Sequence, residues 1–135
     1  MNPIVFHGGC AFSDFRISAL LERFAGLDLP RQPADIEADF VYFLDVAEAL
    51  SGGVRDRAYA LLGADREHDA GHGFYVTPRK GTISPWSSKA TDIFHNCGLA
   101  SVRRVERGVF YRLRDSQGEW LDWDAARPLF PLPPA

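Results

Sequence analysis

The chain has 135 residues, the length of one ordinary domain, of which 46% are hydrophobic and 13% aromatic. This composition excludes a wholly disordered chain, and a formal net charge of −3 gives no general attraction to nucleic acid or to acidic lipid. The sequence has no run of about 18 apolar residues that would predict a membrane-spanning helix, and its N-terminus lacks the basic and apolar segments of a secretory signal. Two cysteines, Cys10 and Cys97, are too few for a disulfide framework, so we expect reduced thiols in a cytoplasmic protein.

The first third of the sequence predicts a strand, a helix and a second strand. Residues 3–6 are apolar and β-favouring, and the His7-Gly8-Gly9 step is expected to end that strand. Ser13 is a good N-cap for a helix whose apolar residues recur with helical spacing until Gly26. Residues 36–44 alternate in polarity, which predicts a strand with one strongly apolar face. That face consists of Ile36, Ala38, Phe40, Tyr42 and Leu44.

The middle of the chain predicts a helix and a short strand. Ser51-Gly52-Gly53 is expected to interrupt the chain before a helix with apolar residues from Val54 onward, which ends at Gly63. Residues 64–72 are polar and predict a loop. Residues 74–77 predict a strand that Pro78 stops.

The last part predicts a helix, a long strand and a tail. Ser84 is an N-cap with Pro85 at the first helical position, and Gly98 ends this helix. Residues 102–113 predict a long strand with Gly108 as a candidate bulge. The tail is rich in proline, with one short helix expected near residues 120–126. The apolar stripe of the predicted helix is Trp86, Ala90, Ile93, Phe94 and Cys97.

The two halves of the chain have the same order of elements, which predicts an α+β fold. Each half has a strand, a serine-capped helix and a strand, and the middle helix joins them. We expect two β-α-β halves in one four-stranded, mainly antiparallel sheet with helices on one face. Residues 1–115 form this domain, and residues 116–135 form a proline-rich tail or the start of a linker.

The densest polar segment, residues 81–89, is the strongest candidate site. A helix that begins near Ser84 offers free backbone amides and a positive dipole end, and Ser87, Ser88 and Lys89 add donors for a phosphate. An N-cap followed by a partner-contacting face explains the same residues, and we favour this interpretation. The residues predicted to lie at an interface or a phosphate are Thr82, Ser84, Trp86, Ser87, Ser88, Lys89, Asp92, His95 and Asn96.

The sequence predicts no catalytic residue and no metal site. Asp92 is placed to orient His95 as an acid–base group, but no third member of a catalytic set is identifiable. Cys97 and His95 do not form a nucleophile pair, because helix residues two positions apart point about 200° apart. His68 and His72 have half of the spacing of a zinc site, but they lie in a predicted loop without a second ligand pair.

Five arginines crowd the predicted long strand. A run of basic residues is typical of nucleic-acid binding. Here, however, Glu106, Asp115 and Glu119 lie among the arginines, and no aromatic platform for stacking bases is evident. We therefore expect a solvated or protein-contacting face and no nucleic-acid partner. The arginines are Arg103, Arg104, Arg107, Arg112 and Arg114.

Residues 77–99, TPRKGTISPWSSKATDIFHNCGL, closely resemble the signature near the N-terminus of the large, single-chain phosphoribosylformylglycinamidine synthase family. Residues 12–17 are similar to the family's first helix, 37–43 to its second strand and 105–111 to the strand after the signature. The resemblance covers about residues 4–114 in order. Lys80 and Phe94 depart from the family pattern, and the tail from residue 126 does not resemble the family's continuing chain.

The resemblance implies a fold similar to a fused dimer of the small subunit found in multi-chain versions of this enzyme. The family makes formylglycinamidine ribonucleotide in purine biosynthesis from the formylglycinamide precursor, ATP and glutamine. In the family this domain is non-catalytic and acts in assembly and ammonia transfer, with the synthetase and glutaminase domains as its partners. ATP and magnesium are expected only in the synthetase domain, and no cofactor in this chain.

The resemblance therefore predicts that this chain alone is an inactive part of an ATP-dependent glutamine amidoligase. Neither nucleic acid nor membrane is an expected partner. A free-standing relative of the domain, serving as a protein-binding or regulatory module, is the alternative. Lys80, Phe94 and the proline-rich tail motivate this alternative.

Overall fold

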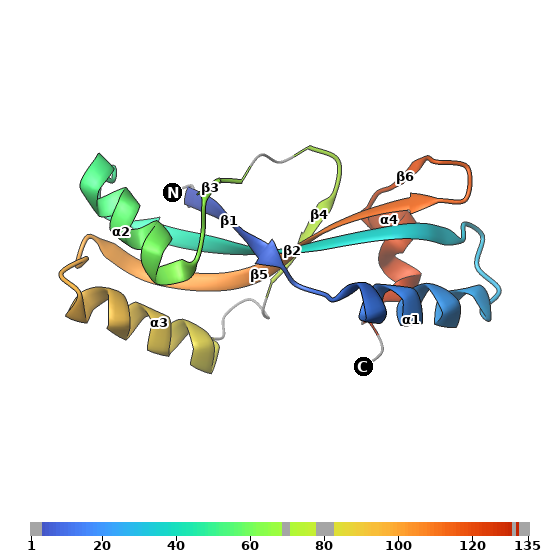
Figure 1. The fold of residues 1–135 in the computed structure, drawn as a ribbon, viewed down its shortest axis with the longest axis horizontal. Helices are drawn as coiled ribbons and strands as arrows, with labels where there is room; N and C mark the ends of the chain where they lie inside the picture. The colour runs from blue at the N-terminus through green and yellow to red at the C-terminus, as the bar shows by residue number, and fades with distance from the viewer. Residues whose placement is uncertain (1–3, 69–70, 78–82, 131, 133–135) are drawn as a thin grey trace. The chain divides into compact units, whose positions relative to one another are not determined.

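The computed structural model describes residues 4–68, 71–77, 83–130 and 132. The fold is α+β, with a six-stranded sheet in the order β3-β1-β2-β5-β4 and with β6 paired to β5 (Figure 1). The strands are β1 (Ile4–Cys10), β2 (Pro33–Val46), β3 (Arg66–Glu67), β4 (Phe74–Val76), β5 (Val102–Asp115) and β6 (Trp120–Leu121). The helices are α1 (Asp14–Ala25), α2 (Gly52–Leu62), α3 (Pro85–Asn96), α4 (Trp123–Ala126) and the short 3-10 helix η1 (Arg127–Leu129).

The prediction of an α+β fold is confirmed, but the prediction of four strands is wrong. The two additional strands, β3 and β6, have two residues each and pair antiparallel with β1 and β5. β3 lies in the segment that we predicted to be a loop, with Arg66 opposite His7 and Glu67 opposite Phe6. Such short strands have no hydrophobic pattern of their own, and only pairing with a distant segment creates them.

β1 continues through the two glycines that were expected to end it. A Cβ atom on Gly8 would lie 2.7 Å from Cε2 of Tyr42 and 3.0 Å from the carbonyl oxygen of Phe40. Gly8 therefore permits β2 and the Tyr42 ring to approach β1 closely, and β1 continues to Cys10. The predicted strand break is wrong for this reason.

A serine residue is the N-cap of each of the three long helices. The side chains of Ser13, Ser51 and Ser84 each accept a hydrogen bond from the backbone N–H three residues later. The predicted caps Ser13 and Ser84 are confirmed. Ser51 is the N-cap of α2, which begins at Gly52. The Ser51-Gly52-Gly53 segment, which was expected to interrupt the chain before the helix, is therefore the start of that helix. Gly63 ends α2 with φ of +69°, a conformation that glycine adopts without steric cost.

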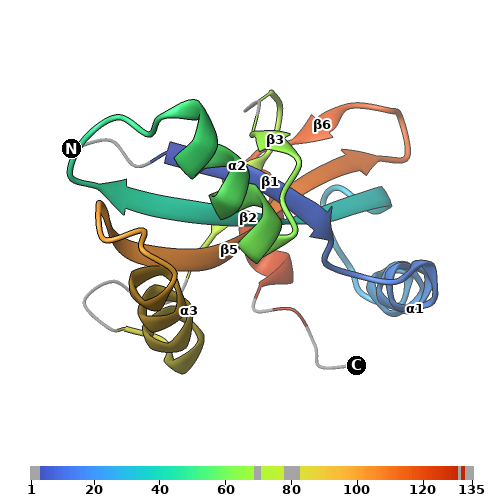
Figure 2. The same cartoon turned by 60° about the vertical axis from the view of Figure 1, so that its left-hand side comes forward.

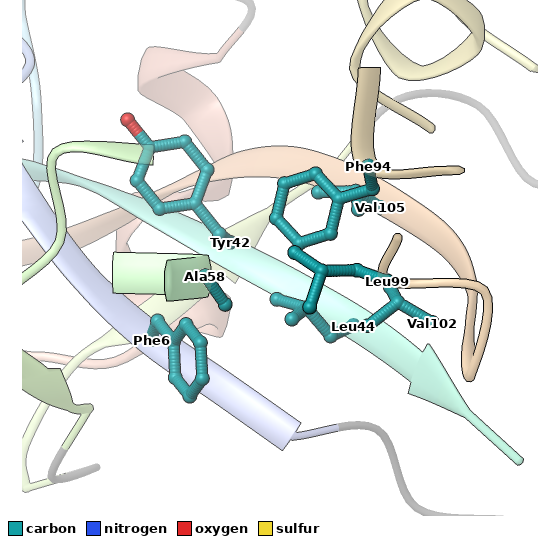
Figure 3. Packing of buried hydrophobic residues seen from close by; sticks show 8 residues of the cluster. All are labelled: Phe6, Tyr42, Leu44, Ala58, Phe94, Leu99, Val102 and Val105. Atoms are coloured by element: carbon teal, nitrogen blue, oxygen red, sulfur yellow. The ribbon is translucent and has the colours of Figure 1, made fainter. Parts of the chain in front are cut away.

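The chain divides into two compact units, and β1, β2 and β5 contribute residues to both. The first unit holds the described residues within 1–9, 40–69 and 76–109. Its helices α2 and α3 bury Ala58 and Phe94 in one cluster with strand residues (Figure 3). The cluster is Phe6, Tyr42, Leu44, Ala58, Phe94, Leu99, Val102 and Val105.

The second unit holds the described residues within 10–39, 70–75 and 110–135. Its helix α1 buries Leu20 and Phe24. The ring centroids of Phe74, Tyr111 and Phe130 lie 5.1 to 5.8 Å apart, which is favourable aromatic packing. Phe130 follows η1, so the tail packs on this unit at least as far as that residue. No helix in the described part of the chain is both long and apolar enough to cross a bilayer.

Candidate functional site

The candidate site is built on α3, which local sequence defines at both ends. Ser84 Oγ accepts a hydrogen bond of 3.0 Å from the backbone N–H of Ser87, and Pro85 takes the first helical position. Gly98 follows the helix with φ of +82°, and Leu99 N–H donates back to the carbonyl oxygen of Phe94. The predicted limits of this helix are therefore confirmed, and α3 runs alongside β5 in both views (Figure 1, Figure 2).

Two hydroxyl side chains of α3 bond both backbone groups of Val105 in β5. Ser87 Oγ donates a hydrogen bond of 2.5 Å to the Val105 carbonyl oxygen. Thr91 Oγ1 accepts a hydrogen bond of 3.1 Å from the Val105 N–H. Both Ser87 and Val105 are fully buried, so these polar groups need partners inside the protein. The two hydroxyls thus bond β5 here as a neighbouring strand would.

The same face of α3 makes further contacts with β5 at both ends of the helix. His95 Nε2 lies 2.9 Å from the carbonyl oxygen of Val102 and donates to it. Ser84 Oγ donates to Glu106 Oε1, which also accepts from the backbone N–H of Arg107, each at 3.0 Å. The N-cap Ser84 and the helix residues Ser87, Thr91 and His95 are spaced by three, four and four positions, which places them on one face of α3.

These bonds change the interpretation of the predicted site residues. Ser87 is buried and its hydroxyl is bonded to Val105, so it is not exposed to a partner. Ser84 and His95 are bonded to Glu106 and Val102 of β5. Asn96 is exposed at the end of α3. Thr82 lies outside the described residues. Thr91 was not among the candidates, although its spacing from Ser87 would have placed it on the same face.

The predicted apolar stripe of α3 is only partly correct. Phe94 is 1% exposed and lies in the core, but Ile93 is 43% exposed and Cys97 is exposed. The reason is that the polar face of α3 lies against β5. Part of the apolar stripe is therefore left uncovered by the sheet.

An apolar hollow of about 240 Å³ lies between α2 and α3. Trp86 stacks on Tyr42 with ring centroids 5.8 Å apart, and the guanidinium of Arg107 lies 5.0 Å from the centre of the Trp86 ring. The residues that line the apolar hollow are Tyr42, Leu61, Leu62, Trp86, Lys89, Ala90, Ile93 and Phe94.

A polar hollow of about 240 Å³ lies between α3 and β5. It brings the predicted residues Ser88 and Asp92 together with Arg103 and Arg104. The guanidinium groups are already paired, at 3.1 Å each, with Asp45 and Glu106 respectively. The residues that line the polar hollow are Ile83, Ser87, Ser88, Thr91, Asp92, Arg103 and Arg104.

The predicted phosphate donors do not converge on one place. Ser87 and Ser88 both line the polar hollow, but the Ser87 hydroxyl is bonded to β5, and Lys89 lines the apolar hollow instead. Asp92 lies at the polar hollow, whereas His95 is oriented by the carbonyl oxygen of Val102. In the described part of the chain, no three histidine, cysteine or acidic residues gather as a metal site requires.

The acidic groups with displaced pKa values lie away from α3. A hydrogen bond from His7 lowers the pKa of Asp65, next to β3. Hydrogen bonding from the Glu119 backbone N–H, followed by that from Arg31, lowers the pKa of Asp115 at the end of β5. Asp65 bonds His7 of β1, and Asp115 bonds Arg31, so both carboxylates are engaged within the fold.

The second unit has a larger hollow of about 510 Å³ that sequence analysis missed. Carboxylates outnumber guanidinium groups on its wall. The alternating acids of β2 were the available signal, because alternate residues of a strand point to one face. The charged residues of this hollow are Asp14, Asp35, Glu37, Asp39, Arg112 and Arg114.

Comparison with known protein families gives one match that covers more than half of the chain. Residues 39–130 match the family model described as formylglycinamide ribonucleotide amidotransferase N-terminal. The matched segment runs from β2 to Phe130 and includes all of α2, α3 and β5. The match confirms the resemblance found in the sequence, because this amidotransferase and the synthase are two names for one enzyme.

Proposed function

The chain belongs to the formylglycinamide ribonucleotide amidotransferase N-terminal family, and from this membership we propose that it is a non-catalytic domain of that enzyme of purine biosynthesis. It acts in the assembly of the enzyme and in the transfer of ammonia between its other parts. Its partners are the synthetase and glutaminase domains, and ATP and magnesium bind in the synthetase domain. Nucleic acid and membrane are not its partners.

The observation that carries this proposal is the structural use of the polar residues in the signature. Ser87 and Thr91 bond the backbone of Val105, and His95 bonds that of Val102. These side chains hold α3 against β5 and are thereby occupied within the fold. The signature thus supports a rigid surface, which a domain that works by contact requires.

Exposed apolar side chains support a role in contact with other domains. Leu61 and Ile93 beside the apolar hollow are 40% and 43% exposed. Apolar groups gathered on a surface are typical of places where another protein packs.

The strand order supports an origin of the domain from two copies of a smaller subunit. In the predicted duplication, β1 and β2 belong to one half and β4 and β5 to the other. The observed order β1-β2-β5-β4 places the two pairs next to each other, with the second strand of each half at the centre. We include this fused arrangement in the proposal.

Reconstitution of the enzyme tests the proposed function. The synthetase and glutaminase parts are produced without this domain, and product formation is measured with the formylglycinamide substrate, ATP and magnesium. Either glutamine or an ammonium salt supplies the nitrogen. We expect no turnover by the isolated chain, and we expect its addition to restore glutamine-dependent activity more than ammonium-dependent activity.

Two outcomes would contradict the proposal. Product formation by the isolated chain with an ammonium salt would show that it is catalytic. Equal activity of the remaining parts with and without the chain would favour the free-standing binding module.

A further inference from the structure

The apolar hollow is a surface that the fold leaves open. Leu61 from α2 and Ile93 from α3 line it, and their side chains are 40% and 43% exposed. Tyr42 and Phe94, which belong to the buried cluster (Figure 3), also line the apolar hollow. Covering such exposed apolar side chains with another apolar group is favourable, because it removes their surface from water.

The polar contacts of α3 explain why this surface is open. Ser87 and Thr91 point to β5, so the helix is fixed with its polar face against that strand. Trp86 and Ile93 are thereby turned toward α2. Since α2 buries only Ala58 fully, the two helices do not close over the space between them.

One cation lines the apolar hollow, and a second, outside its lining residues, connects α2 to the end of α3. Lys89 lines the apolar hollow near the start of α3, and Arg57 of α2 donates to the carbonyl oxygen of Cys97 at the end of α3, at 3.5 Å. Neither cation pairs with a carboxylate within the described ranges of the chain. Eight residues of α-helix separate positions 89 and 97, which is about 12 Å, or about two helical turns.

We propose that the apolar hollow receives an acidic amphipathic helix from the synthetase and glutaminase parts of the enzyme. Apolar side chains one turn apart on that helix cover Leu61, Trp86 and Ile93. Its carboxylates, about two turns apart, meet Lys89 and Arg57. A second copy of this chain fits less well, because it would bring the same two cations against each other. This inference rests on the proposed function.

A binding experiment with the complete chain and the separately produced remainder of the enzyme tests this surface. The dissociation constant is measured by calorimetry for the wild type, Ile93→Asp, Lys89→Glu and the matched control Phe15→Asp. Phe15 is 85% exposed on α1, in the other unit, so the control places the same charge on a different exposed apolar residue. Thermal melts by circular dichroism establish that each variant is folded.

We expect Ile93→Asp to weaken binding by roughly tenfold or more, because it places a charge among apolar groups. Lys89→Glu should weaken binding by about three- to tenfold and reduce its dependence on salt, because it reverses one attractive charge. Phe15→Asp should bind within about twofold of the wild type, because it lies outside the proposed contact.

The outcomes separate this inference from the proposed function. If the wild type does not bind the remainder of the enzyme, both are wrong. If it binds and neither Ile93→Asp nor Lys89→Glu weakens binding, the proposed function stands and this surface is not the contact. Self-association of the wild type that Ile93→Asp abolishes, seen by sedimentation, would make a second copy the occupant and overturn the inference.

Discussion

Ile93 and Phe94 are neighbours in sequence with opposite environments. Phe94 is 1% exposed and packs in the core of the first unit, whereas Ile93 is 43% exposed beside the apolar hollow. Successive helix residues point about 100° apart, so one turn of α3 serves both the core and the open surface. The large Phe94 ring is accommodated inside the fold.

We therefore predict different losses of stability for two alanine substitutions. Phe94→Ala should lower the free energy of unfolding by about 3 to 5 kcal/mol, because it leaves a cavity in the core. Ile93→Ala should lower it by less than about 1 kcal/mol, because much of this side chain is already in water. Urea melts of the two variants measure both values. Equal losses would contradict the burial described here.

At the scale of the element, α3 is held to β5 by side-chain bonds to the strand backbone. Buried backbone N–H and carbonyl groups need hydrogen-bond partners inside the protein. Ser87 and Thr91 provide those partners for Val105. The hydroxyl residues of the signature thus belong to the contact between a helix and a strand.

Thr91→Val tests this contact, because valine keeps the shape of threonine and removes the hydroxyl. The Val105 N–H would be buried without a partner, so the free energy of unfolding should fall by about 1 to 3 kcal/mol. Hydrogen exchange of the Val105 amide, followed by NMR, should become faster. Ser88→Ala, on the exposed side of α3, is the control and should change neither quantity measurably. Unchanged protection of Val105 in Thr91→Val would rule out the described bond.

At the scale of the whole molecule, one carboxylate joins segments that are far apart in sequence. Asp115 at the end of β5 accepts two hydrogen bonds from Arg31, at 2.9 and 3.1 Å, and two from backbone N–H groups. Arg31 also donates to the carbonyl oxygen of Trp120 in β6. These bonds hold the connector after α1 and the β5–β6 turn together within the second unit.

The lowered pKa of Asp115 predicts how acid affects stability. Because the hydrogen bonds favour the charged form, its pKa is lower in the folded chain than in the unfolded chain. Its contribution is complete above the unfolded value and is lost as the pH falls through the folded value. Asp115→Asn should therefore be less stable than the wild type at pH about 7, with the difference shrinking below pH about 4. Urea melts across this range measure the difference, and a constant difference at all pH values would contradict the prediction.

The sequence alone determined the parts of this protein that depend on neighbouring residues. Serine caps, helix spacing and strand alternation act over four residues or fewer, and they located α1, α3 and most of β2. The long signature segment also indicated the family, which the match to residues 39–130 confirms.

The tertiary structure decided everything that depends on residues far apart in sequence. β3 exists only because β1 pairs with it, and Gly8 lies in a strand against Phe40 and Tyr42 of β2, which are distant in sequence. The same holds for Ser87, whose hydroxyl has its partner 18 residues away in β5. Burial and hydrogen bonding are properties of pairs of groups, and a local pattern contains only one member of each pair.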